Sequence, residues 1–201
     1  MNITTKTNLW SGIAPAMIAS LSLIPAVTHA APALPPGLNE LGPENGHLAK
    51  FVGDWDVVET AWSSPNVAPK ISKLVAQRKM IGSFLQETIR PSLNSAQVLR
   101  IDYLSFNRVE GRWKYLSMDT RVPAGLMPAA SFGRGEKGRI ELTFDPFSDP
   151  KTGQLLQMHQ AIIDVDANHS RKDQYFVLAD GTGKTQLLHR YAYTRRIAKS
   201  N

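Results

Sequence analysis

The sequence predicts an all-β protein in which about ten antiparallel strands close into an up-and-down barrel, with a short N-terminal helix. From Trp55 onward, short segments alternate between apolar and polar residues and are rich in β-branched or aromatic side chains, which is typical of half-buried strands. Turn residues such as Glu110-Gly111 and Asp149-Pro150 separate these segments. The connections are too short for parallel crossovers, and closing the sheet removes its unpaired edges.

The elements follow one another without an internal repeat. A short helix is expected around Asn39–Lys50, just before the first strand. The expected strands, in order, are Trp55–Trp62, Ile71–Lys79, Phe84–Arg90, Gln97–Phe106, Arg112–Thr120, Ala129–Gly133, Arg139–Phe144, Leu156–Asp166, Lys172–Leu178 and Gln186–Arg195. The segment from Asp180 to Thr185 resembles a phosphate-binding loop, but it lacks the first glycine of that motif and an alternating strand follows it. We therefore interpret it as a hairpin turn.

The N-terminus indicates export. Residues 1–30 combine a weakly basic start, an apolar run and small residues at Thr28 and Ala30, which is typical of a cleaved signal peptide. A leader rich in proline and glycine is expected over residues 31–46, and the barrel domain over residues 47–197. Pro15 and Pro25 interrupt the apolar run, which is too short for a membrane anchor. The mature protein is expected in the periplasm or secreted, without membrane insertion.

Composition excludes several classes of function. The chain has no cysteine, so thiol catalysis, thiolate zinc sites and iron–sulfur clusters are excluded. Its formal net charge is +6, but lysine and arginine are scattered among acidic residues, so nucleic-acid binding is not expected. The histidines show no metal-binding spacing, and no metal site is expected.

Strand parity predicts which side chains enter the lumen, because successive side chains of a strand point to opposite faces. Arg100 and Asp102 are expected to face solvent, which turns Tyr103 inward. His159 is expected inside because it shares a face with apolar Ala161. The polar residues expected in a mostly apolar lumen are Glu87, Tyr103, Tyr115, Asp119, His159 and His189.

Some of these residues have equally good structural interpretations. An inward histidine is commonly a hydrogen-bonded core residue, and an inward tyrosine commonly packs with its hydroxyl at the rim. Glu87 lies outside if its strand is bulged. Asp119 is followed by Arg121, so it is either a catalytic acid or half of a salt bridge at the lip of the barrel.

Several motifs resemble known barrel families. Gly53-Asp54-Trp55 resembles the first strand of lipocalin-like barrels, where the indole plugs the closed end. Together with residues 82–87, 113–119 and 144–146, it is similar to the DUF1579 family of uncharacterised lipocalin-like proteins. Where that family has Gly-Tyr-Asp, residues 105–107 of this chain are Ser-Phe-Asn. His189, in the last strand, resembles the haem-binding histidine of nitrobindins, although their glycine-rich first strand is missing here.

These observations predict a protein that binds a small hydrophobic or aromatic molecule in its lumen. The expected ligand-binding residues are Trp55, Tyr103, Trp113, Tyr115 and Tyr191. The first alternative is an enzyme of the lyase, isomerase or hydrolase type, with acid–base groups among Glu87, Asp119, His159 and His189. In it, burial would raise the pKa of a lumen carboxylate toward neutrality. The second alternative is haem bound through His189; otherwise no cofactor is expected, and a homodimer is left open.

Overall fold

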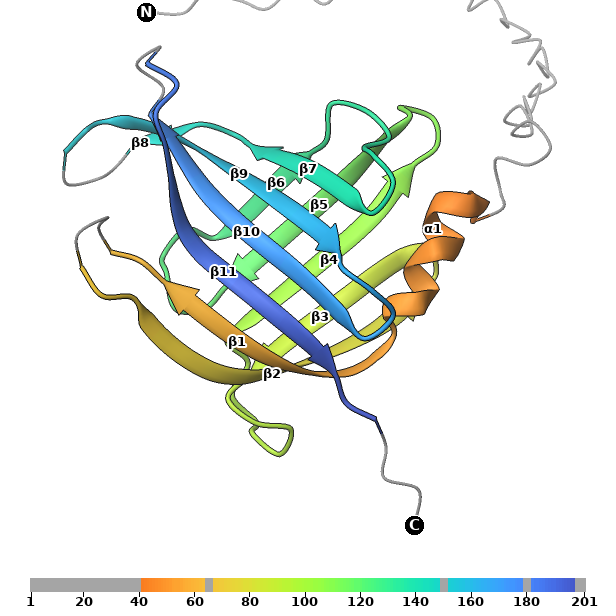
Figure 1. Ribbon diagram of the computed structural model, residues 1–201. Helices are drawn as coiled ribbons and strands as arrows, with labels where there is room; N and C mark the ends of the chain where they lie inside the picture. The colour runs from red at the N-terminus through yellow and green to blue at the C-terminus, as the bar shows by residue number, and fades with distance from the viewer. Residues whose placement is uncertain (1–40, 64–66, 149–151, 179–181, 198–201) are drawn as a thin grey trace, which may run out of the picture. The chain divides into compact units, whose positions relative to one another are not determined.

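The computed structural model describes residues 41–63, 67–148, 152–178 and 182–197, and Figure 1 shows its elements. The expected signal peptide and most of the leader lie outside the described residues. The elements are α1 (Gly42–Leu48), the 3-10 turn η1 (Ala49–Phe51), β1 (Gly53–Ala61), β2 (Lys70–Ile81), β3 (Phe84–Arg90), β4 (Arg100–Asn107), β5 (Arg112–Asp119), β6 (Leu126–Ala130), β7 (Arg139–Phe144), β8 (Phe147–Ser148), β9 (Leu155–Asp164), β10 (His169–Leu178) and β11 (Thr185–Arg195).

The strands form a closed antiparallel barrel, as the sequence predicts. Each of β1 to β6 pairs with the next strand, β7 pairs with β9, β9 with β10, β10 with β11, and β11 returns to β1. The short strand β8, which the sequence did not predict, pairs with the end of β9 outside this ring. Closure leaves none of the ten barrel strands with a free edge, which satisfies their backbone hydrogen bonds.

The interior is built from the inward-facing positions of every strand. Its apolar part includes Val57, Leu74, Ile89, Leu142 and Phe144, each less than 9% exposed. Inward and outward residues alternate clearly in β7, where Leu142 and Phe144 are buried and the residues between and before them are exposed. This strand has the orientation that its alternation predicts.

One end of the barrel is closed around Trp55. The indole is 1% exposed, and its Nε1 donates a hydrogen bond to the Phe51 carbonyl at 2.9 Å. The Arg195 guanidinium covers the ring at 4.3 Å and donates to the Val52 carbonyl at 2.7 Å. Gly53 permits this arrangement, since its φ of +128° disfavours other residues and a Cβ would lie 3.2 Å from Arg195 Nη1.

Helix α1 lies beside this end of the barrel (Figure 1). Asn45 attaches it to β4, donating from Nδ2 to the Phe106 carbonyl at 3.0 Å and accepting from the Phe106 amide at 2.6 Å. The helix is shorter than expected, because η1 replaces its last turn. Within the described residues, no helix has the length and apolar character needed to cross a membrane.

Candidate functional site

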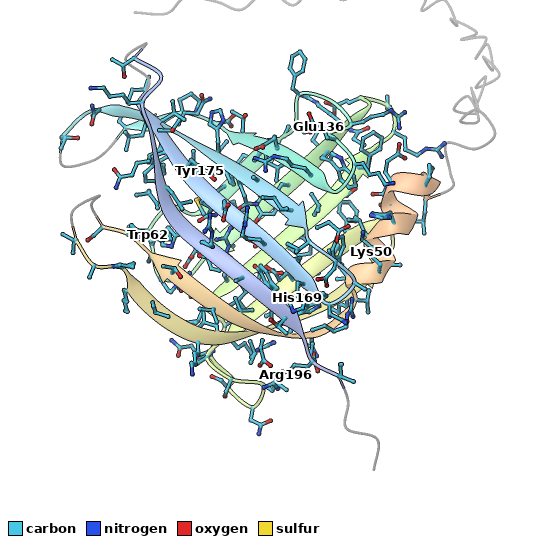
Figure 2. The ribbon with its side chains drawn as sticks, viewed as in Figure 1. Lys50, Trp62, Glu136, His169, Tyr175 and Arg196 are labelled. Carbon is cyan, nitrogen blue, oxygen red and sulfur yellow. The ribbon has the colours of Figure 1, made fainter. Side chains whose placement is uncertain are left out.

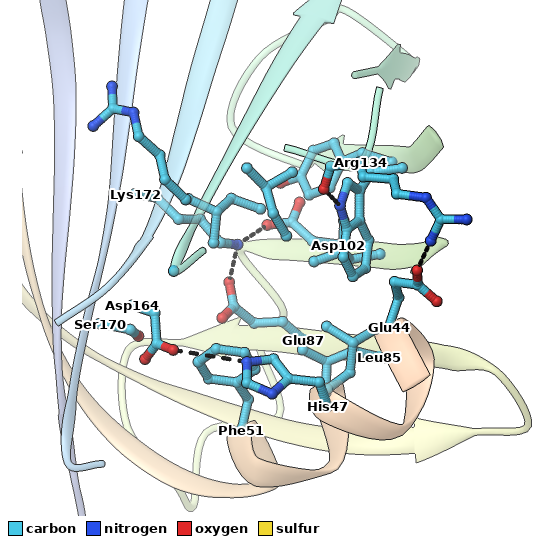
Figure 3. Close-up of a pocket in the computed structure, with 18 of the residues that line it drawn as sticks. Glu44, His47, Phe51, Leu85, Glu87, Asp102, Arg134, Asp164, Ser170 and Lys172 are labelled. Carbon is cyan, nitrogen blue, oxygen red and sulfur yellow. Dashed lines mark hydrogen bonds and ion pairs between the residues drawn. The ribbon is translucent and has the colours of Figure 1, made fainter. Parts of the chain in front are cut away.

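A cavity of about 340 Å³ opens between α1 and the end of the barrel, and Figure 3 shows its surroundings. Its walls are largely apolar, formed by Leu48, Phe51, Leu85, Leu104, Trp113, Ile140 and Ile162. At the rim, Arg134 forms an ion pair with Glu44, and His47 lies 3.8 Å from Asp164 (Figure 3). The interior side of the cavity, called the cavity floor below, is bordered by four charged side chains: Arg78, Glu87, Asp102 and Lys172.

Lys172 joins the two acidic residues of this cavity floor. Its Nζ donates to Glu87 Oε1 at 2.5 Å and to Asp102 Oδ2 at 2.8 Å, as the dashed lines in Figure 3 show. All three residues are at most 5% exposed. Strands β3, β4 and β10 bring them together from distant parts of the chain, because their side chains point inward from the same level of the barrel.

Arg78 of β2 holds the other side of Glu87. Its Nε donates to Glu87 Oε2 at 2.5 Å, and its Nη1 donates to Ser170 Oγ at 3.1 Å. The rings of Trp55 and Tyr193 lie 4.7 and 4.1 Å from the guanidinium. These cation–π contacts in a desolvated setting fix the orientation of the arginine.

Below this floor, Arg100 of β4 extends the network along the lumen. Its Nε donates to Asp102 Oδ1 at 2.8 Å, while its Nη groups donate to the hydroxyls of Tyr115 at 2.9 Å and Tyr191 at 3.3 Å. Gln160 accepts a further hydrogen bond at 3.5 Å. A continuous polar layer therefore crosses an otherwise apolar barrel.

The cations keep the buried carboxylates ionised. Burial alone would raise the pKa of Glu87, but Lys172 and Arg78 outweigh it and the pKa is lowered. The pKa of Asp102 is likewise lowered against burial by Arg100 and Lys172. Burial also opposes the charge of Lys172, yet Asp102 and Glu87 raise its pKa well above the ordinary value. The raised carboxylate pKa expected for acid–base catalysis is not found at Glu87.

The opposite mouth of the barrel carries a second polar group. Arg121 Nη1 lies 2.8 Å from Glu59 Oε2, and its Nη2 lies 2.8 Å from Asp119 Oδ2. His189 Nδ1 lies 3.4 Å from Glu59 Oε1, and its ring stacks on Tyr191 with centroids 6.1 Å apart. Burial would raise the pKa of Glu59, but its contacts with His189, Arg121 and Tyr191 lower it to about 2.

Comparison with known proteins places the chain in a family. The family described as "Protein of unknown function (DUF1579)" matches residues 40–195. The chain belongs to the DUF1579 family. The search of curated proteins found no match.

Among solved structures, this DUF1579 chain is similar to the Rv2717c protein of M. tuberculosis, at 17% identity and a TM-score of 0.46. That comparison covers 79% of this chain and 100% of the other. It is also similar to the S-type phycobiliprotein lyase CPES of Guillardia theta, at 11% identity and a TM-score of 0.45, covering 78% of this chain and 97% of the other.

The structure brings some of the predicted site residues to the cavity of this DUF1579 barrel. Glu87, Trp113 and Tyr115 line it. Trp55 lies behind Arg78, against its guanidinium. Tyr191 lies below, between Arg100 and Arg121, and its hydroxyl accepts a hydrogen bond at 3.3 Å from each.

Asp119 and His189 face the lumen at the opposite mouth, away from the cavity. Of the two interpretations left open for Asp119, the structure shows the salt bridge at the lip. His189 contacts Glu59 and does not line the cavity of about 340 Å³, so haem binding through His189 stays a prediction. In the part of the chain that the structure describes, no group of three or more His, Asp or Glu side chains could hold a metal ion.

The predicted inward orientation of Tyr103 is wrong. In β4 the residues on either side of Tyr103 enter the lumen, since Asp102 bonds Lys172 and Leu104 lines the cavity. Tyr103 therefore points outward, and its hydroxyl accepts a hydrogen bond from Gln86 Nε2 at 2.6 Å. The prediction failed because Arg100 and Asp102 were assigned to solvent by their charge.

The predicted inward orientation of His159 is also wrong. Its neighbours Met158 and Gln160 are buried, and Gln160 bonds lumen residues. His159 lies on the outer face, opposite Tyr175 of β10, which is labelled in Figure 2. The His159 Nε2 atom lies 3.4 Å from Gln157 Oε1. The prediction failed because apolar residues share the face of His159, and this outer face of β9 is only partly exposed.

Sequence reasoning missed Lys172 and Arg78, the two buried cations that line the cavity. A usable signal exists for Asp102, which has the parity of Leu104 and Phe106. For Lys172 the sequence offers little, because its strand alternates weakly between Lys172, Asp173 and Gln174.

Proposed function

We propose that this protein is an exported barrel that binds a small hydrophobic or aromatic ligand in its lumen. The observation that carries the proposal is the cavity of about 340 Å³ at the α1 end. Its volume lies in the range of small-molecule sites, which are mostly apolar pockets with a few polar groups that fix orientation. Trp113 and Tyr115 supply aromatic surface, and Lys172 and Glu87 supply the polar groups.

Binding is favoured over acid–base catalysis by the ionisation of the lumen. A general acid at neutral pH needs a carboxyl group with a raised pKa. Here the pKa values of Glu87, Asp102 and Asp119 are all lowered, since basic partners outweigh the burial of each. Charged groups that are fixed in ion pairs suit the orientation of a ligand better than proton transfer.

The binding test uses a pair of adjacent positions on β9. Ile162 lines the cavity, whereas Ile163 points to the other face. Ile162→Trp should fill the cavity and weaken binding of a naphthalene-based fluorescent probe at least about tenfold, since each lost increment of 1.4 kcal/mol is tenfold in affinity. Ile163→Trp adds the same indole outside and should leave the affinity unchanged.

Fluorescence titration and a thermal melt of each variant would check this prediction. If a well-folded Ile162→Trp protein binds the probe as well as the parent, the ligand does not occupy this cavity. If the parent binds neither the probe nor any co-purifying molecule by native mass spectrometry, the proposed function is wrong.

Export is a separate part of the proposal and rests on the pattern of residues 1–30. Expression of the full chain in a bacterial host should yield a periplasmic protein that begins at Ala31. Intact-mass measurement of the periplasmic fraction checks this. Retention of residues 1–30 in a cytoplasmic product would contradict export without affecting the binding test.

A further inference from the structure

The cavity floor belongs to a buried group of five charges in which cations outnumber anions. Arg78, Arg100 and Lys172 are positive, while Glu87 and Asp102 are negative. None is more than 5% exposed. Lys172 contacts both carboxylates, Arg78 contacts Glu87, and Arg100 contacts Asp102. These five residues therefore carry a formal charge of +1 next to a largely apolar cavity.

The tyrosine hydroxyls around this group are neutral and do not offset its positive charge. Burial raises the pKa of Tyr115 and holds the pKa of Tyr193 well above its ordinary value, and it raises that of Tyr191 to about 12. All three phenols are therefore neutral at pH 7. At the opposite mouth, Glu59 and Asp119 share the single cation Arg121. The excess negative charge of the lumen therefore lies at that mouth, away from the cavity.

Lys172 has donor capacity beyond its two carboxylate partners and lines the cavity. An ammonium group has three N–H donors and no acceptor. Two of the donors go to Glu87 and Asp102 at 2.5 and 2.8 Å, and Lys172 itself lines the cavity (Figure 3). Arg78 lines the same cavity and is fixed between the rings of Trp55 and Tyr193. Two positioned cations thus border a space whose walls are largely apolar.

We propose that the ligand is an amphipathic monocarboxylate, whose carboxylate contacts Lys172 and Arg78 and whose apolar body lies along Leu104, Ile140 and Ile162. This inference rests on the proposed function and names the class of its ligand. One negative charge balances the floor, whereas a phosphate monoester with nearly two charges would exceed it. Because a desolvated, unpaired charge is costly, neutralisation by the ligand strengthens binding in this cavity.

The test compares three ligands with the same apolar chain: decanoate, 1-decanol and decylammonium. Isothermal titration calorimetry at pH 7 should give decanoate an affinity at least about tenfold higher than 1-decanol, with decylammonium weakest. If 1-decanol or decylammonium binds as tightly as decanoate, the charge preference is wrong while the proposed function stands. If none of the three binds, the proposed function fails and this inference fails with it.

Variants that change the charge of the floor in opposite directions sharpen the test. Lys172→Met removes the excess charge and should reduce the preference for decanoate over 1-decanol to less than about threefold. Asp102→Asn adds to the excess and should increase the preference. Lys79→Met, an equal charge change at an exposed position of β2, should leave it unchanged. Equal preferences in all folded variants would overturn the assignment, and the three-ligand series does not depend on the stability of any variant.

Discussion

At the α1 end of the lumen, Lys172, Glu87 and Asp102 are at most 5% exposed and border a cavity, whereas Arg121 at the opposite mouth is 31% exposed. Both ends combine arginine or lysine with two carboxylates. At the mouth, Arg121 lies between Glu59 and Asp119 and spans the opening with ion pairs. At the cavity end, the charges leave an apolar space beside them. The same residue types therefore form partly exposed ion pairs at one end and border a cavity at the other.

Burying ion pairs confers little net stability compared with packed apolar residues, because desolvation offsets their attraction. A barrel this size could be filled with aliphatic side chains instead. Stability alone therefore does not explain the buried charges beside the cavity, and the ligand binding proposed above would.

The largest effect is expected for Lys172→Met. This change leaves Glu87 and Asp102 side by side without their shared cation, so the free energy of unfolding should fall by about 3–5 kcal/mol, as for other broken buried pairs. Urea denaturation checks it. Equal stability of Lys172→Met and the parent would mean that water reaches the cavity floor freely.

A smaller loss is expected at the mouth for Arg121→Leu. Glu59 is 4% exposed and would lose its bidentate partner, at 2.8 and 3.1 Å, but water can enter beside it. We expect a loss of about 1–3 kcal/mol, the cost of an unsatisfied polar group. Decanoate binding at the other end should not change. A loss as large as that of Lys172→Met would contradict the distinction between the two ends.

The pH dependence of stability should report the mouth through Glu59. Its folded pKa of about 2 lies below the ordinary value of 4.5, so its contribution is complete above pH 4.5 and is lost as the pH falls toward 2. Other carboxylates also titrate there, so the measurement is the difference between the parent and Glu59→Gln. Urea midpoints at pH 6, 5, 4 and 3 should converge as the pH falls. A constant difference would contradict the lowered pKa.

Much of the fold could be predicted from the sequence. The expected bounds of Phe84–Arg90 and Arg139–Phe144 match β3 and β7, and the closed barrel follows from the spacing of turns. Glu87, Trp113 and Tyr115 lie inside, as strand parity predicts, and they alternate with less buried residues. The alternative in which Glu87 lies outside is not what the structure shows. Alternation over a strand is a local property, and it determines these positions without knowledge of the partner strands.

The charged floor could not be predicted in the same way. Charged residues are almost never fully buried unless they are paired, and the pairing of Asp102 with Lys172 joins positions 70 residues apart. A single sequence does not reveal this contact, so Arg100 and Asp102 were assigned outward and Tyr103 inward. In β9, where His159 and Gln160 are both polar, the apolar residues on the face of His159 led to the wrong orientation.

The smallest effect is expected at His159, and its neighbour provides the matched control. His159 lies on the outer face, so His159→Ala should change the free energy of unfolding by about 0.5 kcal/mol or less, as at other surface positions. Gln160 is fully buried and accepts a hydrogen bond from Gln174 at 2.8 Å. Gln160→Ala should therefore cost about 1–3 kcal/mol, because it leaves lumen donors unpaired. A one-residue change of register reverses the two faces of a strand. If Gln160→Ala cost less stability than His159→Ala, the inward and outward faces of β9 would be exchanged, and Ile162 would not line the cavity.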